Sequence, residues 1–382
     1  MKANWSYPTE IRFGAGRISE LADVCAGAGV RRPLFVTDRS LATLPITQQA
    51  LKLVSSSAVL FSDVSPNPKG ADVAKGVALY QQEKCDGVIG FGGGSALDTA
   101  KTIAFMQGQN RPIWDFEDIG DWWTRANADA IAPVIAIPTT AGTGSEVGRA
   151  SVITKEDSQE KKIIFHPKML PVEVIADPEL TVGLPPVLTA GAGMDVLAHC
   201  MEAYCAPNFH PMSAGIALEG MRLVSQALVR AVKDGSDIEA RSHMLIAASM
   251  GAVAFQKGLG AIHSLSHPVG AMYQTHHGMT NAVFMPYVLV YNREVIQGKI
   301  GPMCDAIGID RGFDSLLDWV LQLRQEINVP HTLEDFGVPD DQVDLIAERA
   351  VADPSTGTNP RVLDEKGAKQ IFLAAHSGSL EF

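Results

Sequence analysis

The amino-acid sequence predicts two domains, an α/β domain followed by an all-helical domain. The length of 382 residues fits two domains of roughly 100–200 residues each. The first half alternates short apolar runs with helical patterns, whereas the segments after about Pro185 are long, rich in Ala, Leu and Met, and helical in period. This order of elements is typical of an α/β domain joined to a separate helical one. We therefore expect the domains to span residues 1–184 and 185–382.

The apolar runs of the first half predict the strands of a parallel sheet. Each run is short and apolar at successive positions, which is the pattern of a strand that helices cover on both faces. The expected strands span residues 33–37, 58–61, 87–91 and 133–138, and the expected helices 70–84 and 96–106. In the second half, helices are expected near residues 186–205, 212–232, 236–255, 314–326, 340–352 and 366–375.

Composition and charge exclude several classes of protein. A hydrophobic content of 46% supplies the apolar mass that a disordered chain lacks. A net charge of −12 argues against nucleic acid or an anionic membrane as the main partner. No apolar run reaches the ~18 residues of a spanning helix, and residues 1–8 show no apolar signal-peptide core. The five cysteines are odd in number and lack CxxC spacing, which favours free thiols in a reducing, cytoplasmic compartment.

Three consecutive glycines, Gly92-Gly93-Gly94, stand where an expected strand turns into an expected helix. Glycines let the backbone approach a ligand closely and adopt positive φ, and the N–H groups at a helix start favour a phosphate. Ser95 is placed either to cap this helix or to donate to such a phosphate. The pattern is neither the GxGxxG fingerprint nor a P-loop, so a tight turn before a capped helix explains it equally well.

A second polar loop, Pro138–Val147, follows the next expected strand. Its four hydroxyl residues and two glycines suit the second wall of a nucleotide crevice, which forms at the carboxyl ends of parallel strands. A polar surface loop is the alternative. Two such loops at consecutive strand ends favour the nucleotide site.

The helical half carries a cluster of acid and histidine side chains. Asp195 and His199 are four residues apart, and His263 and His267 repeat this spacing, which places each pair on one face of a helix. Four of the ten histidines fall within residues 263–277. A single such pair is more often a surface or core pair, but two pairs and a further histidine site in an apolar domain predict a metal centre. One carboxylate and three imidazoles suit divalent Fe or Zn with an open position for substrate.

Together these motifs resemble the iron-containing (group III) alcohol dehydrogenase family. The resemblance covers nearly the whole chain, from Ile11–Gly16 through the glycine loop and Pro138–Val147 to the metal cluster. It implies an NAD(P)-binding α/β domain, a helical metal-binding domain in a dehydroquinate synthase-like architecture, and a homodimer. It also implies hydride transfer between NAD(H) and a small primary alcohol or aldehyde, with the metal as a Lewis acid.

The resemblance assigns metal ligands and a catalytic residue by position. The four ligands fall on Asp195, His199, His263 and His277, and His267 matches a histidine near the nicotinamide and the substrate. We expect His267 to transfer a proton or to hold the substrate, because its ordinary pKa suits that role. Orienting a metal ligand is the alternative role for His267.

The cofactor site is assigned in the same way. Asp38 matches a residue that faces the adenosine ribose, where a carboxylate accepts from the ribose hydroxyls and repels a 2′-phosphate, so NAD is expected rather than NADP. Capping of a helix that begins near Ser40 is the alternative role of Asp38. The other positions that match the pyrophosphate loop and the cofactor lining are Gly93, Gly94, Ser95, Asp98, Asn67, Thr139, Thr140, Thr143 and Lys161.

Two cations depart from the family pattern and point to an anionic substrate. Lys257 lies just before His263, and Arg149 follows the Pro138–Val147 loop, at positions where relatives tend to be uncharged. Together they suit a substrate carboxylate, Arg149 through a bidentate fork and Lys257 as a point charge. Exposure to solvent, or pairing with Asp or Glu of this acidic chain, is the alternative.

Other functions stay open at this stage. A lyase of the dehydroquinate synthase type shares the architecture, NAD and the divalent metal, but no basic cluster for a phosphorylated acid lies beside residues 195–199 or 263–277. A zinc glycerol dehydrogenase is a neighbour among the oxidoreductases, and Fe and Zn both accept this ligand set. The complete ligand set argues against a metal-free maleylacetate reductase, and a metal-storage or scaffold protein leaves both loops unexplained.

Overall fold

The computed structural model describes residues 9–54 and 57–381. Within this part the chain forms two compact units. The α/β unit comprises residues 9–140 and 144–182, and the helical unit comprises residues 141–143 and 183–381. The sequence analysis placed the division after residue 184, and residues 1–8 of its first domain lie outside the described part.

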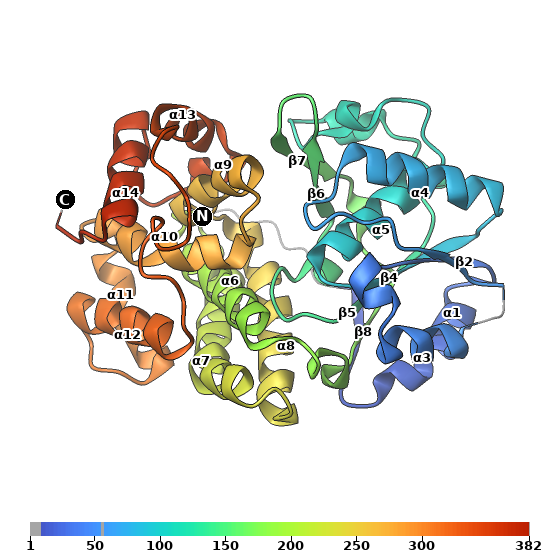
Figure 1. Ribbon diagram of the computed structural model, residues 1–382, viewed down its shortest axis with the longest axis horizontal. Coiled ribbons are helices and arrows are strands. Elements are labelled where there is room, and N and C mark those ends of the chain that lie inside the picture. Colours follow the sequence, from blue (N-terminus) through green and yellow to red (C-terminus); the bar gives the residue numbers. More distant parts are fainter. Residues whose placement is uncertain (1–8, 55–56, 382) are drawn as a thin grey trace. The chain divides into compact units, whose positions relative to one another are not determined.

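The α/β unit is built on a six-stranded parallel sheet (Figure 1). The strands lie in the order β1-β8-β5-β4-β2-β3. After β3 the chain crosses back over β2 to β4, so the strand order reverses between β2 and β4. The carboxyl ends of strands at such a switch point are the favoured ligand position in open parallel sheets. The strands are β1 (Glu10–Phe13), β2 (Pro33–Val36), β3 (Val59–Phe61), β4 (Gly87–Gly92), β5 (Val134–Pro138) and β8 (Glu173–Ala176).

Helices cover both faces of this sheet because successive strand residues point to opposite sides. Leu34 and Val88 belong to a core shared with α4 and α5, whereas Phe35 and Ile89 belong to a core shared with α1 and α3. The helices are α1 (Leu21–Gly27), α2 (Arg39–Ala42), α3 (Pro45–Leu53), α4 (Gly70–Gln82) and α5 (Gly94–Met106). An antiparallel hairpin is formed by β6 (Ala150–Lys155) and β7 (Glu160–Phe165).

The helical unit packs nine α-helices of the described chain around one apolar core. Helix α6 is buried along most of its length. Gly278 lies so close to α6 that an added Cβ would come 2.1 Å from the carbonyl oxygen of Gly191, so glycine lets α10 begin directly against α6. The helices are α6 (Pro186–Cys205), α7 (Pro211–Lys233), α8 (Ile238–Ala254), α9 (Ala261–Tyr273), α10 (His277–Asn292), α11 (Gln297–Ile307), α12 (Phe313–Glu326), α13 (Val343–Ala352) and α14 (Glu365–Ser377).

A sharp break separates α8 from α9. A single 3₁₀ turn, Phe255–Lys257, ends α8, and the next residue, Gly258, has φ +137°. A Cβ at Gly258 would lie 2.4 Å from the Cβ of Thr358, so a larger residue would disturb both. Among the described residues no single helix is long and apolar enough to cross a membrane; only the pair α8 and α9, bent by 108°, passes by length and composition.

The expected fold class is confirmed, and most expected elements appear. Helix α6 has the predicted bounds, and all five cysteines are buried and unpaired. Helices α9, α10 and α11 are not among the predicted helices, although the spacing of His263 and His267 assumed a helix there. Each contains an interior proline: Pro268, Pro286 and Pro302. Proline removes one helical hydrogen bond and is read as a stop signal. The short edge strand β1, the hairpin β6–β7 and strand β8 were also missed.

Candidate functional site

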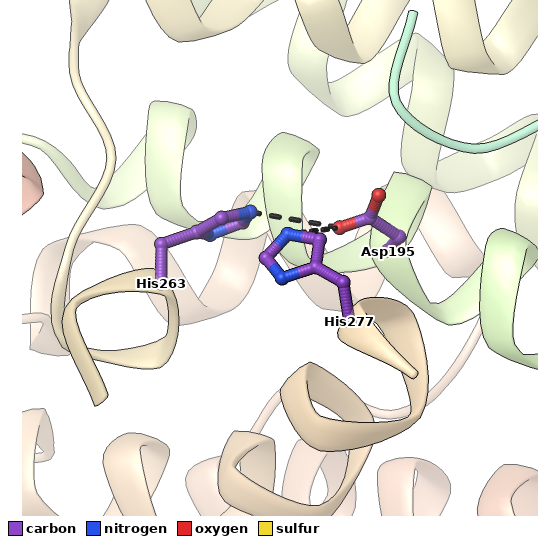
Figure 2. Close-up of side chains that lie close together, drawn as sticks. All are labelled: Asp195, His263 and His277. Carbon is purple, nitrogen blue, oxygen red and sulfur yellow. Dashed lines mark ion pairs between the residues drawn. The ribbon is translucent and has the colours of Figure 1, made fainter. Parts of the chain in front are cut away.

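Three helices of the helical unit bring candidate metal ligands together. Asp195 lies on α6, His263 lies on α9, and His277 is the first residue of α10. One donor atom from each of the three lies within 4.8 Å of the others. Asp195 Oδ1 is 3.5 Å from Nε2 of His263 and 3.6 Å from Nε2 of His277, and Figure 2 shows both rings directed at this carboxylate.

The fourth expected ligand, His199, lies one helical turn after Asp195. Its Nε2 is 3.6 Å from Asp195 Oδ1, and its ring stacks on that of His263 with the centroids 4.8 Å apart. It does not belong to the group of three mutually close donors. The structure therefore brings three expected ligands into one group and places the fourth beside the shared carboxylate.

The spacing of these atoms fits a divalent metal ion. Ligand atoms at tetrahedral angles and about 2.1 Å from zinc are about 3.4 Å apart, close to the 3.5 and 3.6 Å between Asp195 and the two histidines. Within the described residues, Nδ1 of His199 and Oδ1 of Asn281 are buried without a hydrogen-bond partner. A carboxylate with imidazoles is a donor set for Fe or Zn.

Burial and charge set the protonation of the cluster. Burial lowers the pKa of His199 to about 4. Burial pushes the pKa of Asp195 upward, but the neighbouring histidines, His199 first, bring it well below its usual range. At His263 burial lowers the pKa, but the carboxylates of Glu202 and Asp195 outweigh it and raise the pKa to about 10.

Glu202 and Asn281 hold the candidate ligands, and the sequence analysis missed both. Glu202 contacts Nδ1 of His263 through Oε2 at 2.5 Å and accepts from the Ile262 N–H through Oε1 at 2.7 Å. Asn281 Nδ2 donates to Asp195 Oδ1 at 2.8 Å. Partners of this kind fix the orientation of a ligand and the tautomer of a histidine. Their sequence signal was spacing, because each lies one helical turn after a candidate ligand.

His267 lies at the margin of the cluster. Its ring stacks on that of His277 at 5.4 Å between centroids and with an interplanar angle of 14°, and its Nδ1 is 2.7 Å from Asp353 Oδ2. It is not one of the three mutually close donors. His276 has a different task, because its Nδ1 accepts from the Met279 N–H at 3.3 Å and so caps α10.

The two candidate substrate cations belong to different units. Lys257 is 3% exposed, and its Nζ donates to the carbonyl oxygen of Tyr204 at 2.8 Å, in the last turn of α6. Burial, and then Lys299, lowers the pKa of Lys257 to about 8. A cation that caps a helix C-terminus has a structural role, which differs both from the expected substrate contact and from the alternative of solvent exposure or pairing with Asp or Glu. The Arg149 guanidinium carbon lies 5.6 Å from the ring centroid of Phe165.

In the α/β unit, the glycine turn joins β4 to α5. Gly92 has φ +150°, and a Cβ there would lie 2.8 Å from the Cβ of Ala96. Gly93 faces Thr140, whose Oγ1 would be 3.2 Å from an added Cβ. Within the described residues no side chain caps α5. The glycines therefore leave the backbone N–H groups at the start of α5 uncovered by side chains of their own.

Ser95 does not cap α5, contrary to one of the two roles expected for it. Its hydroxyl donates instead to the carbonyl oxygen of Pro66 at 2.5 Å, which ties the helix start to the turn that carries Asn67. Asp98 Oδ1 accepts from the Ser145 hydroxyl at 2.6 Å, and its Oδ2 accepts from the Val152 N–H at 2.9 Å. Asp98 therefore holds the glycine turn against the loop after β5.

Most of the remaining cofactor candidates follow the carboxyl ends of strands, whereas Lys161 lies near the start of β7. Asp38 follows β2, and its Oδ1 accepts from the N–H groups of Ser40 and Leu41 at 2.9 Å each, so it caps α2. These two bonds leave Oδ2 out of the cap. Thr139 is buried and its N–H donates to the Gly92 carbonyl at 2.9 Å, whereas Asn67, Thr140, Thr143 and Lys161 are half-buried, with Thr143 in the segment that groups with the helical unit.

Comparison with known proteins gives the family. The model of the iron-containing alcohol dehydrogenases matches residues 8–178, and the model of the C-terminal part of the Fe-containing alcohol dehydrogenase family matches residues 189–376. The chain belongs to the iron-containing alcohol dehydrogenase family. It is thus an iron-type alcohol oxidoreductase, and the family match favours this activity over the lyase considered above.

Individual relatives extend over almost the whole chain. The 4-hydroxybutyrate dehydrogenase of Cupriavidus necator is 39% identical over 366 residues, which are 93% of this chain and 95% of that protein. The crystal structure of a 1,3-propanediol oxidoreductase matches with a TM-score of 0.93 and 31% identity, covering 98% of this chain and 100% of the other. The sulfoacetaldehyde reductase from Bifidobacterium kashiwanohense, solved in complex with NAD⁺, matches with a TM-score of 0.90 and 27% identity, covering 99% of each chain.

Proposed function

We propose that the protein reduces a small aldehyde that carries a carboxylate, or oxidises the corresponding primary alcohol, with NAD(H) and a divalent metal. The convergence of the donors of Asp195, His263 and His277 supports the metal chemistry. The relative named for 4-hydroxybutyrate supports the substrate class, and the relative solved with NAD⁺ supports the cofactor.

In this proposal the metal ligands are Asp195, His199, His263 and His277. A divalent metal held there, Fe(II) first and Zn(II) second, supplies Lewis acidity that lowers the pKa of an alcohol hydroxyl. His267, at the margin of the cluster, takes or returns the hydroxyl proton. The homodimer, the cytoplasmic location and the absence of nucleic-acid or membrane partners remain predictions.

The α/β unit binds the cofactor in this proposal through backbone more than through side chains. The uncapped start of α5 offers N–H groups and a positive dipole end to the pyrophosphate. Gly93 and Gly94 leave room for its approach, and Ser95 and Asp98 hold the turn in place. Asp38 Oδ2, which the α2 cap does not use, is the acceptor for a ribose hydroxyl.

A matched substrate pair tests the proposal. Succinic semialdehyde and its methyl ester have the same chain length at the aldehyde end, but only the acid carries a charge. A charged hydrogen bond contributes about 1.5–3 kcal/mol, so kcat/KM with NADH and Fe(II) should favour the acid by about tenfold or more. Equal kcat/KM values for acid and ester would refute the anionic substrate while leaving the alcohol oxidoreductase in place.

A further inference from the structure

Helix α9 carries two histidines one turn apart, and each has its Nδ1 against a carboxylate. His263 Nδ1 contacts Glu202 at 2.5 Å, and His267 Nδ1 contacts Asp353 at 2.7 Å. The carboxylates come from different elements, Glu202 from α6 and Asp353 from the junction after α13. The same contact is therefore built twice, although only His263 belongs to the group of mutually close metal donors.

The position of Asp353 is fixed from several sides. Its Oδ1 accepts from the Ser355 N–H at 2.8 Å, which caps the 3₁₀ turn Pro354–Thr358. The hydroxyl of Thr356 in this turn donates to Ser264 on α9 at 2.7 Å. The carboxylate and the imidazole are only 10% and 13% exposed. Since the turn is tied to the helix that carries His267, the distance between the two side chains does not depend on a loose loop.

The contact decides which nitrogen of His267 carries a proton. Asp353 Oδ1 accepts from the Ser355 N–H at 2.8 Å, and an aspartate is ordinarily ionised near neutral pH. An ionised carboxylate can only accept hydrogen bonds, so Nδ1 of His267 must be the donor. In the neutral ring, Nε2 then has the lone pair.

We propose that Asp353 is a positioning residue that holds His267 as the Nδ1–H tautomer, so that Nε2 accepts the proton of the alcohol. The inference rests on the proposed function of His267. In the oxidation direction the hydroxyl O–H bond breaks, its electron pair stays on oxygen, and the proton forms an N–H bond at Nε2. The imidazolium keeps its Nδ1–H on Asp353. The carbinol C–H bond then breaks, its hydride goes to the oxidised nicotinamide, and the electron pair on oxygen forms the C=O bond of the aldehyde.

Two substitutions separate this role from the capping role of the same carboxylate. Asp353→Asn has nearly the same shape but only one oxygen. If that oxygen caps the turn at Ser355, the amide NH₂ faces Nδ1 and reverses the tautomer. Asp353→Ser keeps a good cap but is too short to reach His267. Loss of an orienting partner typically costs about 10–100-fold in activity.

We expect kcat to fall about 10–100-fold in both variants, with metal content, NADH affinity and Tm near those of the wild type. Asp364→Asn is the matched control, because Asp364 caps α14 through the Gly367 N–H at 2.7 Å and should leave kcat unchanged. The ¹⁵N NMR spectrum of histidine-labelled protein, with His267→Gln for assignment, should show an unprotonated Nε2 in the wild type and a protonated Nε2 in Asp353→Asn.

The His267→Ala variant separates the failure of this inference from that of the proposed function. If His267→Ala is slow while both Asp353 variants keep wild-type kcat, the positioning role is refuted and the function of His267 stands. If His267→Ala also keeps wild-type kcat, both are refuted. Loss of metal or of folding in both Asp353 variants would make Asp353 a structural residue and overturn the inference.

Discussion

The two candidate sites of this molecule are built on opposite principles. In the helical unit, functional side chains converge: three donors lie within 4.8 Å of one another, and further side chains such as Glu202 and Asn281 hold them. In the α/β unit, side chains are mostly committed to the loops themselves. Asp38 caps α2, Ser95 bonds to Pro66, and Asp98 uses both oxygens within the unit.

In the proposed function, this difference corresponds to two sources of binding energy. A metal needs lone pairs on side chains, so the ligands must be preassembled and held by partners. A pyrophosphate is satisfied by backbone N–H groups at a helix start, so the side chains around it serve to shape the turn. We therefore predict that substitutions at the cluster of the helical unit change metal content, whereas substitutions at the glycine turn of the α/β unit change cofactor affinity.

The largest effect is expected from removal of a metal ligand. His263→Ala and His277→Ala should lose bound metal and nearly all turnover, because each removes one of three converging donors. Both variants should still bind NADH, since the glycine turn and most of the loop after β5 belong to the other unit. Metal analysis by mass spectrometry and NADH fluorescence titration on the same samples check this. Full activity of a metal-stripped sample would contradict it.

The reciprocal variant completes this test. Gly92→Ala places a Cβ 2.8 Å from that of Ala96 at φ +150°, so the turn must shift and NADH affinity should fall while metal content is kept. Gly120→Ala is the matched control, because Gly120 also has positive φ, +56°, but nothing lies within 4 Å of its Cβ. Loss of both bound metal and NADH affinity in Gly92→Ala would contradict the separation of the two sites.

A smaller effect is expected at Asp38, whose Oδ2 lies outside the α2 cap. The wild type should prefer NADH over NADPH, because a carboxylate at this strand end repels a 2′-phosphate. Asp38→Gly should narrow the preference, and Asp38→Ser should do the same while keeping a capping hydroxyl. Ratios of kcat/KM with the two cofactors measure this, and a wild-type preference for NADPH would be inconsistent with it.

The sequence predicted more of the metal cluster than of its surroundings. Asp195 and His199, four residues apart, and the histidines of 263–277 carry their chemistry in the residue type and in the helical spacing. Asp353 could not be found this way, since it lies 86 residues from His267 and only folding brings the two together. Glu202 follows the candidate ligand His199 by one helical turn, so the same spacing argument could have found it.

For the loops after β4 and β5, the sequence predicted the positions of the loops better than the roles of their individual side chains. Their glycines and hydroxyl residues predicted turns after β4 and β5, because strand ends and helix starts are local features. Nucleotide binding by these turns remains a prediction. The roles of individual side chains depended on contacts across the unit, such as Asp98 with the Val152 N–H, 54 residues away. Lys257 is a similar case. Its charge is evident from the sequence, but its contact with the C-terminal turn of α6 could be found only from the structure.

Anomalous diffraction at the iron edge from crystals of the Fe(II)-loaded protein tests the central claim most directly, that side chains of the helical unit hold the metal. The account predicts one strong peak within about 2.0–2.3 Å of Nε2 of His263, Nε2 of His277 and a carboxylate oxygen of Asp195, with His199 as the fourth ligand. A peak at any other position in an active, iron-loaded crystal would contradict the account.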